Sequence, residues 1–256
     1  MSAKTPLATV TLAAGKGTRM KSQLHKVLHP IAGRPMIEHL LASAAQLAPE
    51  RSVVVAGHGR EQLEVQLGDR AVIAVQDPQL GTGHAVQQAE GALAGFAGDV
   101  LILYGDVPFV SAETMRNMIE RLHGADQPAV VVLGFEPADT LAYGRVITDG
   151  DRIVKMVEHK DATAEERACR LCNSGLMAVR SADLFGLLAQ AAQDGIARGV
   201  RQLWKRLEDA AEVGLLRGTG QRFRLSRHGV DPVPKPRKCI TPLAPSPASA
   251  AASRRL

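Results

Sequence analysis

Short apolar runs rich in Val, Ile and Leu recur through the first half of the chain, and segments of helical period separate them. None of these runs alternates strictly between apolar and polar residues, so we expect strands that are covered on both faces of a sheet. The predicted strands are Ala8–Leu12, Ser52–Ala56, Ala71–Val75, Val100–Leu103 and Ala129–Leu133.

Between the runs, apolar residues recur at intervals of three and four, which is the period of a helix with one buried face. The first such segment follows Pro35, a residue suited to the first turn of a helix. The predicted helices after it are Arg60–Leu67, Gly83–Leu93, Ala112–Leu122 with a cap at Ser111, Ser181–Ala192 and Val200–Leu207. This alternation predicts an α/β fold with a three-layer, mostly parallel sheet, which binds ligands beyond the carboxyl ends of its strands.

The last quarter of the chain has a different texture. The helical pattern fails from Gly218 onward, and Val230–Ala251 contains six prolines among Ser, Ala, Lys and Arg. Such a segment buries too little apolar surface to offset the entropy of ordering. We therefore predict a folded domain over residues 5–190, a divergent and partly helical extension over 191–229, and a disordered tail over 230–256.

Charge is unevenly distributed along the chain. The formal net charge is +5, but residues 190–256 hold 13 Lys and Arg against 5 Asp and Glu, while residues 1–189 hold 18 against 21. Because the body of the chain is slightly acidic, we expect no nucleic-acid partner.

No feature of the sequence indicates export or a membrane span. No apolar run approaches the ~20 residues that a spanning helix needs, and residues 1–30 lack the apolar region of a signal peptide. The three cysteines are an odd number, which argues against a disulfide scaffold. We expect a protein of the reducing cytoplasm.

A glycine-rich turn follows the first predicted strand, in the stretch LAAGKGTRM at residues 12–20. Gly15 and Gly17 let main-chain N–H groups approach an anion closely. Arg19 and the lysine between the glycines add positive charge, and Lys26 follows. The stretch matches neither G-x-G-x-x-G nor G-x-x-x-x-G-K-[ST]. It suits a triphosphate whose terminal phosphates leave as pyrophosphate; the alternative is a tight turn with solvated cations.

Two polar residues follow predicted strands at the edge where a ligand would bind. Asp106, in LYGDVP, comes after Val100–Leu103, and its carboxylate suits Mg²⁺ beside phosphates. Gln76 comes after Ala71–Val75, and its amide can read a pyrimidine edge. The alternatives are a turn aspartate ahead of Pro108 and an ordinary surface glutamine.

Six motifs, in order, resemble those of the sugar-nucleotide pyrophosphorylases. They are LAAGKGTRM with KVLHPIAGRPMIEH, then QLGTGHA, LYGDVP, AYGRV, VEHKDA and CNSG. Over roughly residues 5–190 they are similar to the uridyltransferase domain of the bacterial bifunctional N-acetylglucosamine-1-phosphate uridyltransferase/glucosamine-1-phosphate acetyltransferases. The resemblance implies a nucleotide-diphospho-sugar transferase (Rossmann-like) fold. It also implies Mg²⁺-dependent transfer of UMP from UTP to N-acetyl-α-D-glucosamine 1-phosphate, for cell-wall precursor synthesis.

The same resemblance implies roles for individual residues. Arg19 and Lys26 are the implied catalytic residues, and Asp106 is the implied Mg²⁺ ligand. The implied substrate-binding residues are Leu12, Ala13, Ala14, Gly15, Lys26, Gln76, Gly81, Thr82, Tyr104, Gly105, Asp106, Gly144, Glu158 and Asn173. Within this set, Gln76, Gly81 and Thr82 are implied to recognise uridine, while Gly144, Glu158 and Asn173 are implied to hold the sugar and its N-acetyl group.

The sequence departs from the resemblance in three places. Lys26 follows His25, where those enzymes usually carry proline, so the turn is expected to be less rigid. After about Gln190 the chain has neither E-Y-Y-x-T-D nor V-E-G-V-N-N, whose Asn is the second Mg²⁺ ligand. It has no hexapeptide repeat, so we expect neither the acetyltransferase half nor an oligomer built on it. The alternatives are another sugar-phosphate nucleotidyltransferase, or a remnant that binds nucleotide with little or no catalysis.

Overall fold

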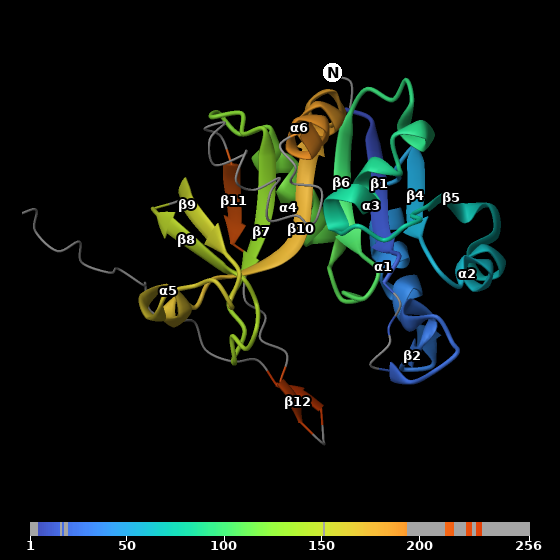
Figure 1. Cartoon of the computed structure of the whole chain (residues 1–256), viewed down its shortest axis with the longest axis horizontal. Helices are drawn as coiled ribbons and strands as arrows, with labels where there is room; N and C mark the ends of the chain where they lie inside the picture. Colours follow the sequence, from blue (N-terminus) through green and yellow to red (C-terminus); the bar gives the residue numbers. More distant parts are fainter. Residues whose placement is uncertain are drawn as a thin grey trace, which may run out of the picture. The chain divides into compact units, whose positions relative to one another are not determined.

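The computed structural model describes residues 5–15, 17, 20–150, 152–193, 213–217, 224–226 and 229–231. The chain consists of two compact units, Met1–Thr219 and Gly220–Leu256. In the described part of the first unit, nine strands form one sheet with helices on both faces (Figure 1). In order across the sheet they are β5 (Val72–Val75), β4 (Arg51–Ala56), β1 (Leu7–Ala13), β6 (Asp99–Tyr104), β10 (Cys172–Arg180), β7 (Val130–Phe135), β11 (Val213–Arg217), β9 (Arg152–Val157) and β8 (Arg145–Asp149).

The strands run mostly in one direction, as predicted. Strand β1 pairs in parallel with β4 and β6, β4 with β5, and β7 with β11. Strand β10 is antiparallel to both of its neighbours, β6 and β7, and β9 is antiparallel to β11 and β8. Among the nine strands of this sheet, only β9 and β10 therefore run in the opposite direction to the others.

Helices complete the two outer layers. They are α1 (Met36–Ala45), α2 (Arg60–Leu67), α3 (Thr82–Gln87), α4 (Ala112–Leu122), α5 (Ala164–Ala168) and α6 (Ser181–Gln193), with short 3₁₀ turns η2 (Lys26–Leu28), η3 (Gly68–Arg70) and η4 (Gly91–Leu93). A short hairpin of β2 (Pro30–Ile31) and β3 (Arg34–Pro35) leads into α1. Helices α3 and α6 cover one face of the sheet, and α1, α2 and α4 cover the other (Figure 1).

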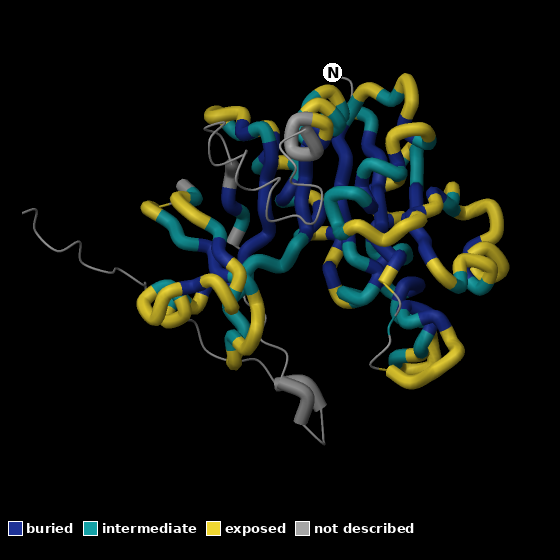
Figure 2. The backbone as a smooth tube through the Cα atoms, viewed as in Figure 1, coloured by how far each residue is buried: buried dark blue, intermediate teal, exposed yellow. Residues whose placement is uncertain are grey.

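The core lies on both faces of the central strands. Every residue of β1 is buried, and the buried segments of Figure 2 follow the strands. In β4, Val53 and Val55 pack toward α3, whereas Val54 and Ala56 pack toward α1 and α2. Each fully buried Val or Leu side chain stabilises the fold by roughly 1.5–3 kcal/mol relative to exposure, so the apolar runs of the sequence became strands covered on both sides.

The five predicted strands are confirmed, but the predicted helix Gly83–Leu93 is wrong in extent. Helix α3 ends at Gln87, and the next amides bond to carbonyls only three residues back, as Gln88 does to Ala85 at 3.2 Å. This tightening leads into η4, which no period of apolar residues signals. Pro35 precedes α1 as its N-cap rather than lying in its first turn. The predicted helix Val200–Leu207 lies outside the described residues.

The main sheet contains four strands that the sequence pattern did not predict: β8, β9, β10 and β11. Strand β11 lies within residues 191–229, which we predicted as an extension, and it pairs with β7 inside the main sheet. The boundaries at 190 and 229 stay predictions.

In the second unit, β12 (Arg224–Ser226) and β13 (Gly229–Asp231) pair in antiparallel orientation. Beyond Asp231, the predicted disordered tail lies outside the described residues.

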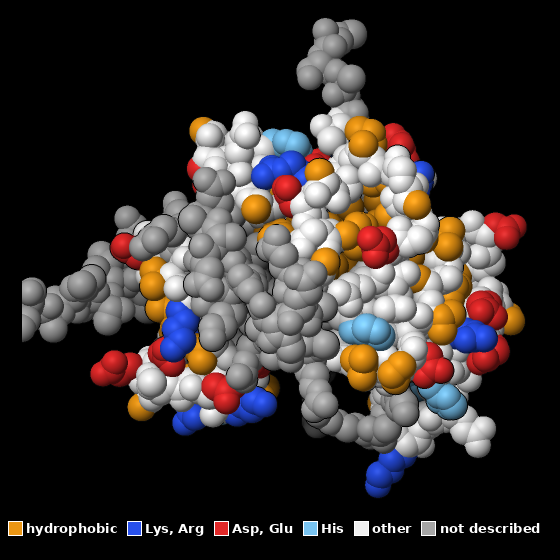
Figure 3. Space-filling view, turned by 45° about the horizontal axis from the view of Figure 1, so that its top comes forward, with side chains coloured by type: hydrophobic (Ala, Val, Ile, Leu, Met, Phe, Trp, Pro, Cys, Tyr) orange, Lys and Arg blue, Asp and Glu red, His pale blue; other side chains and the backbone are white. Residues whose placement is uncertain are grey.

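On the face in Figure 3, Lys and Arg side chains lie in small groups interspersed with Asp and Glu. No described helix is both long enough and apolar enough to cross a bilayer.

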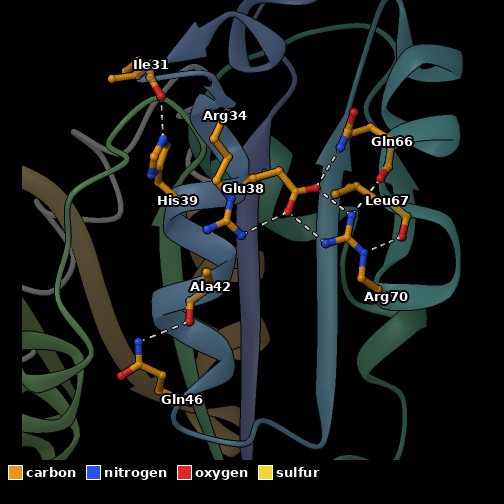
Figure 4. A network of polar contacts seen from close by, with 9 residues as sticks. All are labelled: Ile31, Arg34, Glu38, His39, Ala42, Gln46, Gln66, Leu67 and Arg70. Atoms are coloured by element: carbon orange, nitrogen blue, oxygen red, sulfur yellow. Dashed lines mark hydrogen bonds and ion pairs between the residues drawn. The ribbon is translucent and has the colours of Figure 1, made fainter.

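A buried carboxylate joins α1 to the α2–η3 segment (Figure 4). The Glu38 side chain is 7% exposed, and its two oxygens accept hydrogen bonds from Arg70 at 2.6 and 2.9 Å. Gln66 of α2 donates to the same carboxylate at 3.0 Å, and Arg34 lies 3.8 Å away. The hydrogen bond from Arg70 is the main cause that lowers the pKa of Glu38, and Gln66 adds to it. The ion pair therefore fixes α2 against α1.

Replacing Glu38 with Gln is expected to lower the free energy of unfolding at pH 7 by about 1–3 kcal/mol, since hydrogen bonds to charged groups contribute roughly that much. Because the folded-state pKa is depressed, this contribution is present above the unfolded pKa and is lost as the pH falls through the folded value. Urea titrations from pH 7 downward should therefore show the difference between wild type and variant shrinking in acid.

The matched control is Asp126→Asn, which removes an exposed pair with Arg121 at 2.6 Å. We expect a loss of less than about 1 kcal/mol there. A Glu38→Gln penalty that is as small as the control, or that is equally large in acid, would contradict this account of the carboxylate.

Candidate functional site

The carboxyl ends of β1, β5 and β6 open onto one cavity of about 300 Å³. Parallel pairing sets Leu12 of β1 level with Tyr104 of β6, so the segments that leave the two strands emerge side by side. The residues that line the cavity are Leu12, Ala13, Ala14, Gly15, Lys26, Val27, Gln76, Gln79, Gly81, Thr82, Ala85, Tyr104 and Asp106. The structure thus gathers most of the substrate-binding residues implied by the sequence, together with Val27, Gln79 and Ala85, which were not among them.

The glycine turn after β1 approaches the start of η2. Gly17 has φ of +58°, and a Cβ at this position would lie only 2.8 Å from Cβ of Lys26. Both the backbone conformation and the close approach therefore require glycine. Arg19, with Lys16 and Thr18, lies outside the described residues, so its predicted role stays a prediction.

A short ion pair stands at the cavity wall. Nζ of Lys26 lies 2.5 Å from Oδ2 of Asp106, and both side chains are about one third exposed, at 35% and 34%. Lys26 comes from η2, and Asp106 follows β6. The neighbouring Gly105 does not line the cavity, but its N–H donates to the carbonyl of Leu12 at 2.9 Å, which holds this turn against β1. A cation and an anion therefore lie side by side at the cavity wall.

Gln76 is buried at the end of β5, and its amide has a defined orientation. Its Nε2 donates to the carbonyl of Gly81 at 2.8 Å, an atom that can only accept. The same nitrogen lies 3.1 Å from Nδ1 of His84. Among the described residues, Oε1 has no hydrogen-bond partner, so the amide presents an acceptor to the cavity region.

Gln79 joins this segment to the glycine turn, and sequence reasoning missed it. Its Nε2 donates to the carbonyl of Ala14. Gly57, after β4, packs against both Gln79 and Ala14. The contact is made to a main-chain atom, so no motif of side chains signals it.

The remaining three predicted residues form a second group that touches the first through Tyr104. Gly144 lies beside the carboxylate of Glu158, and its carbonyl accepts from N–H of Asn173 at 2.9 Å. Oδ1 of Asn173 in turn accepts from N–H of Gly175 at 2.8 Å. Gly175 has φ of +83°, and a Cβ there would meet the Tyr104 ring at 2.9 Å. None of the three lines the cavity itself, but the chain of contacts brings them to its border.

A buried arginine supports this second group and was also missed. Arg145 is 2% exposed, and in the described part of the chain no carboxylate pairs with it. Its guanidinium instead donates to the carbonyls of Tyr143 and Arg167, the latter at 3.3 Å, and to Oγ1 of Thr140 at 2.9 Å. A buried charge without such partners would be costly, so moving these acceptors away from the guanidinium would destabilise the fold. Two of them, in Thr140 and Tyr143, lie in the turn that leads into Gly144, and Arg145 therefore holds this turn in place.

The donor set fits a Mg²⁺ ion shared with bound phosphates rather than a cage of protein ligands. Among the described residues, no three His, Cys, Asp or Glu side chains cluster as metal ligands. Asp106 supplies one carboxylate at the cavity, and its Oδ1 makes no described hydrogen bond, while Lys26 contacts Oδ2. Mg²⁺ is commonly held by one or two carboxylates plus substrate phosphates and water.

Comparison with known proteins shows what the chain is similar to. A family model described as a MobA-like NTP transferase domain matches residues 9–211. Two proteins described as bifunctional protein GlmU are similar over about three quarters of the chain. The one from Novosphingobium aromaticivorans is 80% identical over 189 residues, 74% of this chain and 42% of that protein. The one from Sphingopyxis alaskensis is 69% identical over 193 residues, which are 75% of this chain and 43% of that protein. The chain thus spans less than half the length of these curated relatives.

A solved structure shows the same fold. It is described as a glucose-1-phosphate thymidylyltransferase from Bacillus anthracis in complex with a sucrose. It superposes with a TM-score of 0.71 at 16% identity and covers 84% of this chain and 87% of that one. At this identity the likeness concerns the fold alone.

The phenol of Tyr104 is expected to stay neutral far above pH 7. Burial is the main cause that raises its pKa to about 12, with the carboxylates of Asp106 and Glu158 adding to the rise and a hydrogen bond with Thr82 opposing it. Since the folded pKa is raised, the stability that depends on the neutral phenol is present below the unfolded pKa of about 10 and is lost as the pH rises through the folded value.

The chain has two tyrosines, so Tyr143→Phe leaves Tyr104 as the one phenol that can ionise. Ultraviolet difference absorbance of that variant should show the phenol ionising near pH 12. If it ionises at a lower pH, the circular dichroism signal of the folded protein should be lost at the same pH. The variant Tyr104→Phe is the matched control. Ionisation near pH 10 in a protein that is still folded would contradict the burial argument.

Proposed function

The chain belongs to the family of MobA-like NTP transferase domains, and from this we propose that it transfers UMP from UTP to N-acetyl-α-D-glucosamine 1-phosphate. The products would be UDP-N-acetylglucosamine and pyrophosphate. The observation that carries the proposal is the cavity at the strand ends, where the Lys26–Asp106 pair and the oriented amide of Gln76 occur together. The high identity to proteins named GlmU supports the choice within the family.

Gln76 supports uracil as the base. Its Nε2 is engaged with Gly81 and His84, which leaves Oε1 as the available group. Uracil has an N3–H donor that this acceptor can bind, whereas N3 of cytosine is itself an acceptor and would face it unfavourably. Thr82 and the backbone of Gly81 lie in the same cavity and would complete the contacts to the nucleoside.

Lys26 and the glycine turn support a phosphate-transfer centre. The Lys26 ammonium would offset the charge of the incoming sugar phosphate, whose oxygen attacks the α-phosphorus as the bond to pyrophosphate breaks. Main-chain N–H groups near Gly15 would contact the triphosphate, and Arg19 would neutralise the departing pyrophosphate. Reactions of this kind depend on positioning and charge stabilisation and need no covalent intermediate on the protein.

Asp106 would hold Mg²⁺ together with the phosphates. When bound, the ion would neutralise charge that develops on the phosphate oxygens. Lys26 would then move from Asp106 to the acceptor phosphate, so the observed ion pair is a resting arrangement in which each charge keeps the other in place.

Tyr104 and the second group would receive the sugar. The carboxylate of Glu158 can accept hydrogen bonds from sugar hydroxyls, while the Asn173 amide and the backbone of Gly144 can bind the N-acetyl group. Arg145 holds the turn on which this depends. We propose the same cytoplasmic setting and the same cell-wall precursor role that the resemblance implies.

Asp106→Asn is expected to lower Mg²⁺-dependent turnover by at least about 100-fold, because a neutral amide is a far poorer Mg²⁺ ligand than a carboxylate. The measurement is pyrophosphate release from each of UTP, dTTP, CTP, ATP and GTP, paired with N-acetylglucosamine 1-phosphate or glucose 1-phosphate. UTP with N-acetylglucosamine 1-phosphate should give the highest kcat/KM, and CTP should be poor.

The outcomes separate the possible functions. Preference for a different pair would assign the chain to another sugar-phosphate nucleotidyltransferase. UTP binding without turnover would make it a nucleotide-binding remnant. Turnover that Asp106→Asn leaves unchanged would remove Asp106 as the Mg²⁺ ligand. Asp126→Asn, which alters an exposed carboxylate outside the cavity lining, is the matched control.

A further inference from the structure

We propose that Gln62, on α2, is a positioning residue that holds the segment leading into Lys26 through two main-chain hydrogen bonds. The inference rests on the proposed function, because it takes Lys26 as a group that acts on substrate. Gln62 itself does not line the cavity, and no sequence motif points to it.

The side chain of Gln62 bridges two points of the segment. Its Oε1 accepts from the main-chain N–H of His25 at 2.9 Å, and its Nε2 donates to the carbonyl of Gln23 at 3.0 Å. The first bond is made to the residue directly before Lys26, and η2 begins at Lys26. One bond uses the amide oxygen and the other the amide nitrogen, so only one orientation of the amide satisfies both.

The bond to His25 requires an N–H, which proline lacks. His25 has φ of −55°, a value that proline also adopts, so the backbone conformation alone does not exclude proline here. A chain with proline at this position would have a fixed φ but nothing to donate to Gln62. With histidine, this chain has a free φ, and the hydrogen bond supplies the missing restraint.

The surroundings of His25 strengthen the restraint. The residue is 7% exposed, its ring lies near Gly59 at the start of α2, and burial lowers its pKa. The carbonyl of His25 accepts from N–H of Leu28 at 2.9 Å, which closes the η2 turn. The residue is therefore held at its N–H by α2, at its ring by burial, and at its carbonyl by η2.

The anchor for Gln62 is itself fixed. The Arg70–Glu38 ion pair is the main attachment of the α2–η3 segment to α1 (Figure 4), and Gln66, one turn further along α2, adds one weaker hydrogen bond whose loss leaves that pair in place. Gln62 and Gln66 are four residues apart and so lie on one side of the helix. Helix α2 thus carries separate polar contacts to α1, through Gln66, and to the segment that leads into Lys26, through Gln62.

The test compares Gln62→Met with Gln66→Met. Methionine has about the same length as glutamine but cannot make the bonds to His25 and Gln23. Gln62→Met should lower kcat/KM for the sugar phosphate by about 10- to 100-fold, since a small misplacement of a reacting group costs that much. Gln66→Met, which disturbs α2 at a contact away from the segment, should change it by less than about threefold. Equal effects of the two variants would overturn the proposal.

A mutant cycle tests the hydrogen bond itself. Gln62→Met is measured in the His25 background, with His25→Ala and with His25→Pro. Alanine removes the ring but keeps the N–H, whereas proline removes both. The fold decrease in kcat/KM that Gln62→Met causes should be large when residue 25 is histidine or alanine. It should be at least about fivefold smaller when residue 25 is proline. The same factor in all three backgrounds would overturn the proposal.

Amide hydrogen exchange gives a readout that does not need turnover. Exchange of the His25 amide should accelerate in Gln62→Met and stay unchanged in Gln66→Met; unchanged exchange in both would overturn the proposal. Lys26→Ala separates this inference from the proposed function. If Lys26→Ala leaves turnover intact, the role of Lys26 fails, and with it the positioning role of Gln62. If Lys26→Ala abolishes turnover but Gln62→Met does not affect it, the failure is confined to Gln62.

Discussion

The parallel pairing of β1 with β6 is the constraint on which the candidate site depends. It sets Leu12 level with Tyr104, and the bond from Gly105 to Leu12 extends the register one step past the end of β6. The glycine turn and Asp106 therefore leave the sheet together. A shift of one residue would exchange the two buried faces of β1, so that Thr9 and Thr11 would replace the apolar side chains packed on the α3 side, and the 3.1 Å contact of Thr9 with Ser52 would be lost.

The site is then completed by contacts to main-chain atoms. Gln79 binds the carbonyl of Ala14, Gln62 binds around His25, and Arg145 binds the carbonyls beside Gly144. In each case one side chain bonds to the backbone of a loop that carries a predicted functional residue. This arrangement keeps the reactive side chains available for ligand, because the restraint acts on the backbone next to them.

Some strands and site residues could be predicted from the sequence, and others could not. Continuous apolar runs form the strands β1, β4, β5, β6 and β7, so the local pattern was enough to predict them. Gln76 and Asp106 could be predicted as site residues because they follow two of these strands. Strands β8 and β9 carry exposed and polar positions, and β10 is interrupted by a bulge between Asn173 and Met177, so no simple period marks them. Gly144, Glu158 and Asn173 came only from the family resemblance. Gln62, Gln79 and Arg145 were not found, since a contact to a distant carbonyl or N–H leaves no spacing to read.

The most direct measurement is a crystal structure of the chain with Mg²⁺ and a UTP analogue that cannot be cleaved between the α- and β-phosphates. The account predicts the uracil beside Gln76 and Gly81, with N3–H toward Oε1 of Gln76. It also predicts the triphosphate along the glycine turn and Mg²⁺ on Asp106. Nucleotide bound elsewhere on the molecule, or a base that faces away from Gln76, would contradict the central claim that the cavity at the strand ends is the site of nucleotidyl transfer.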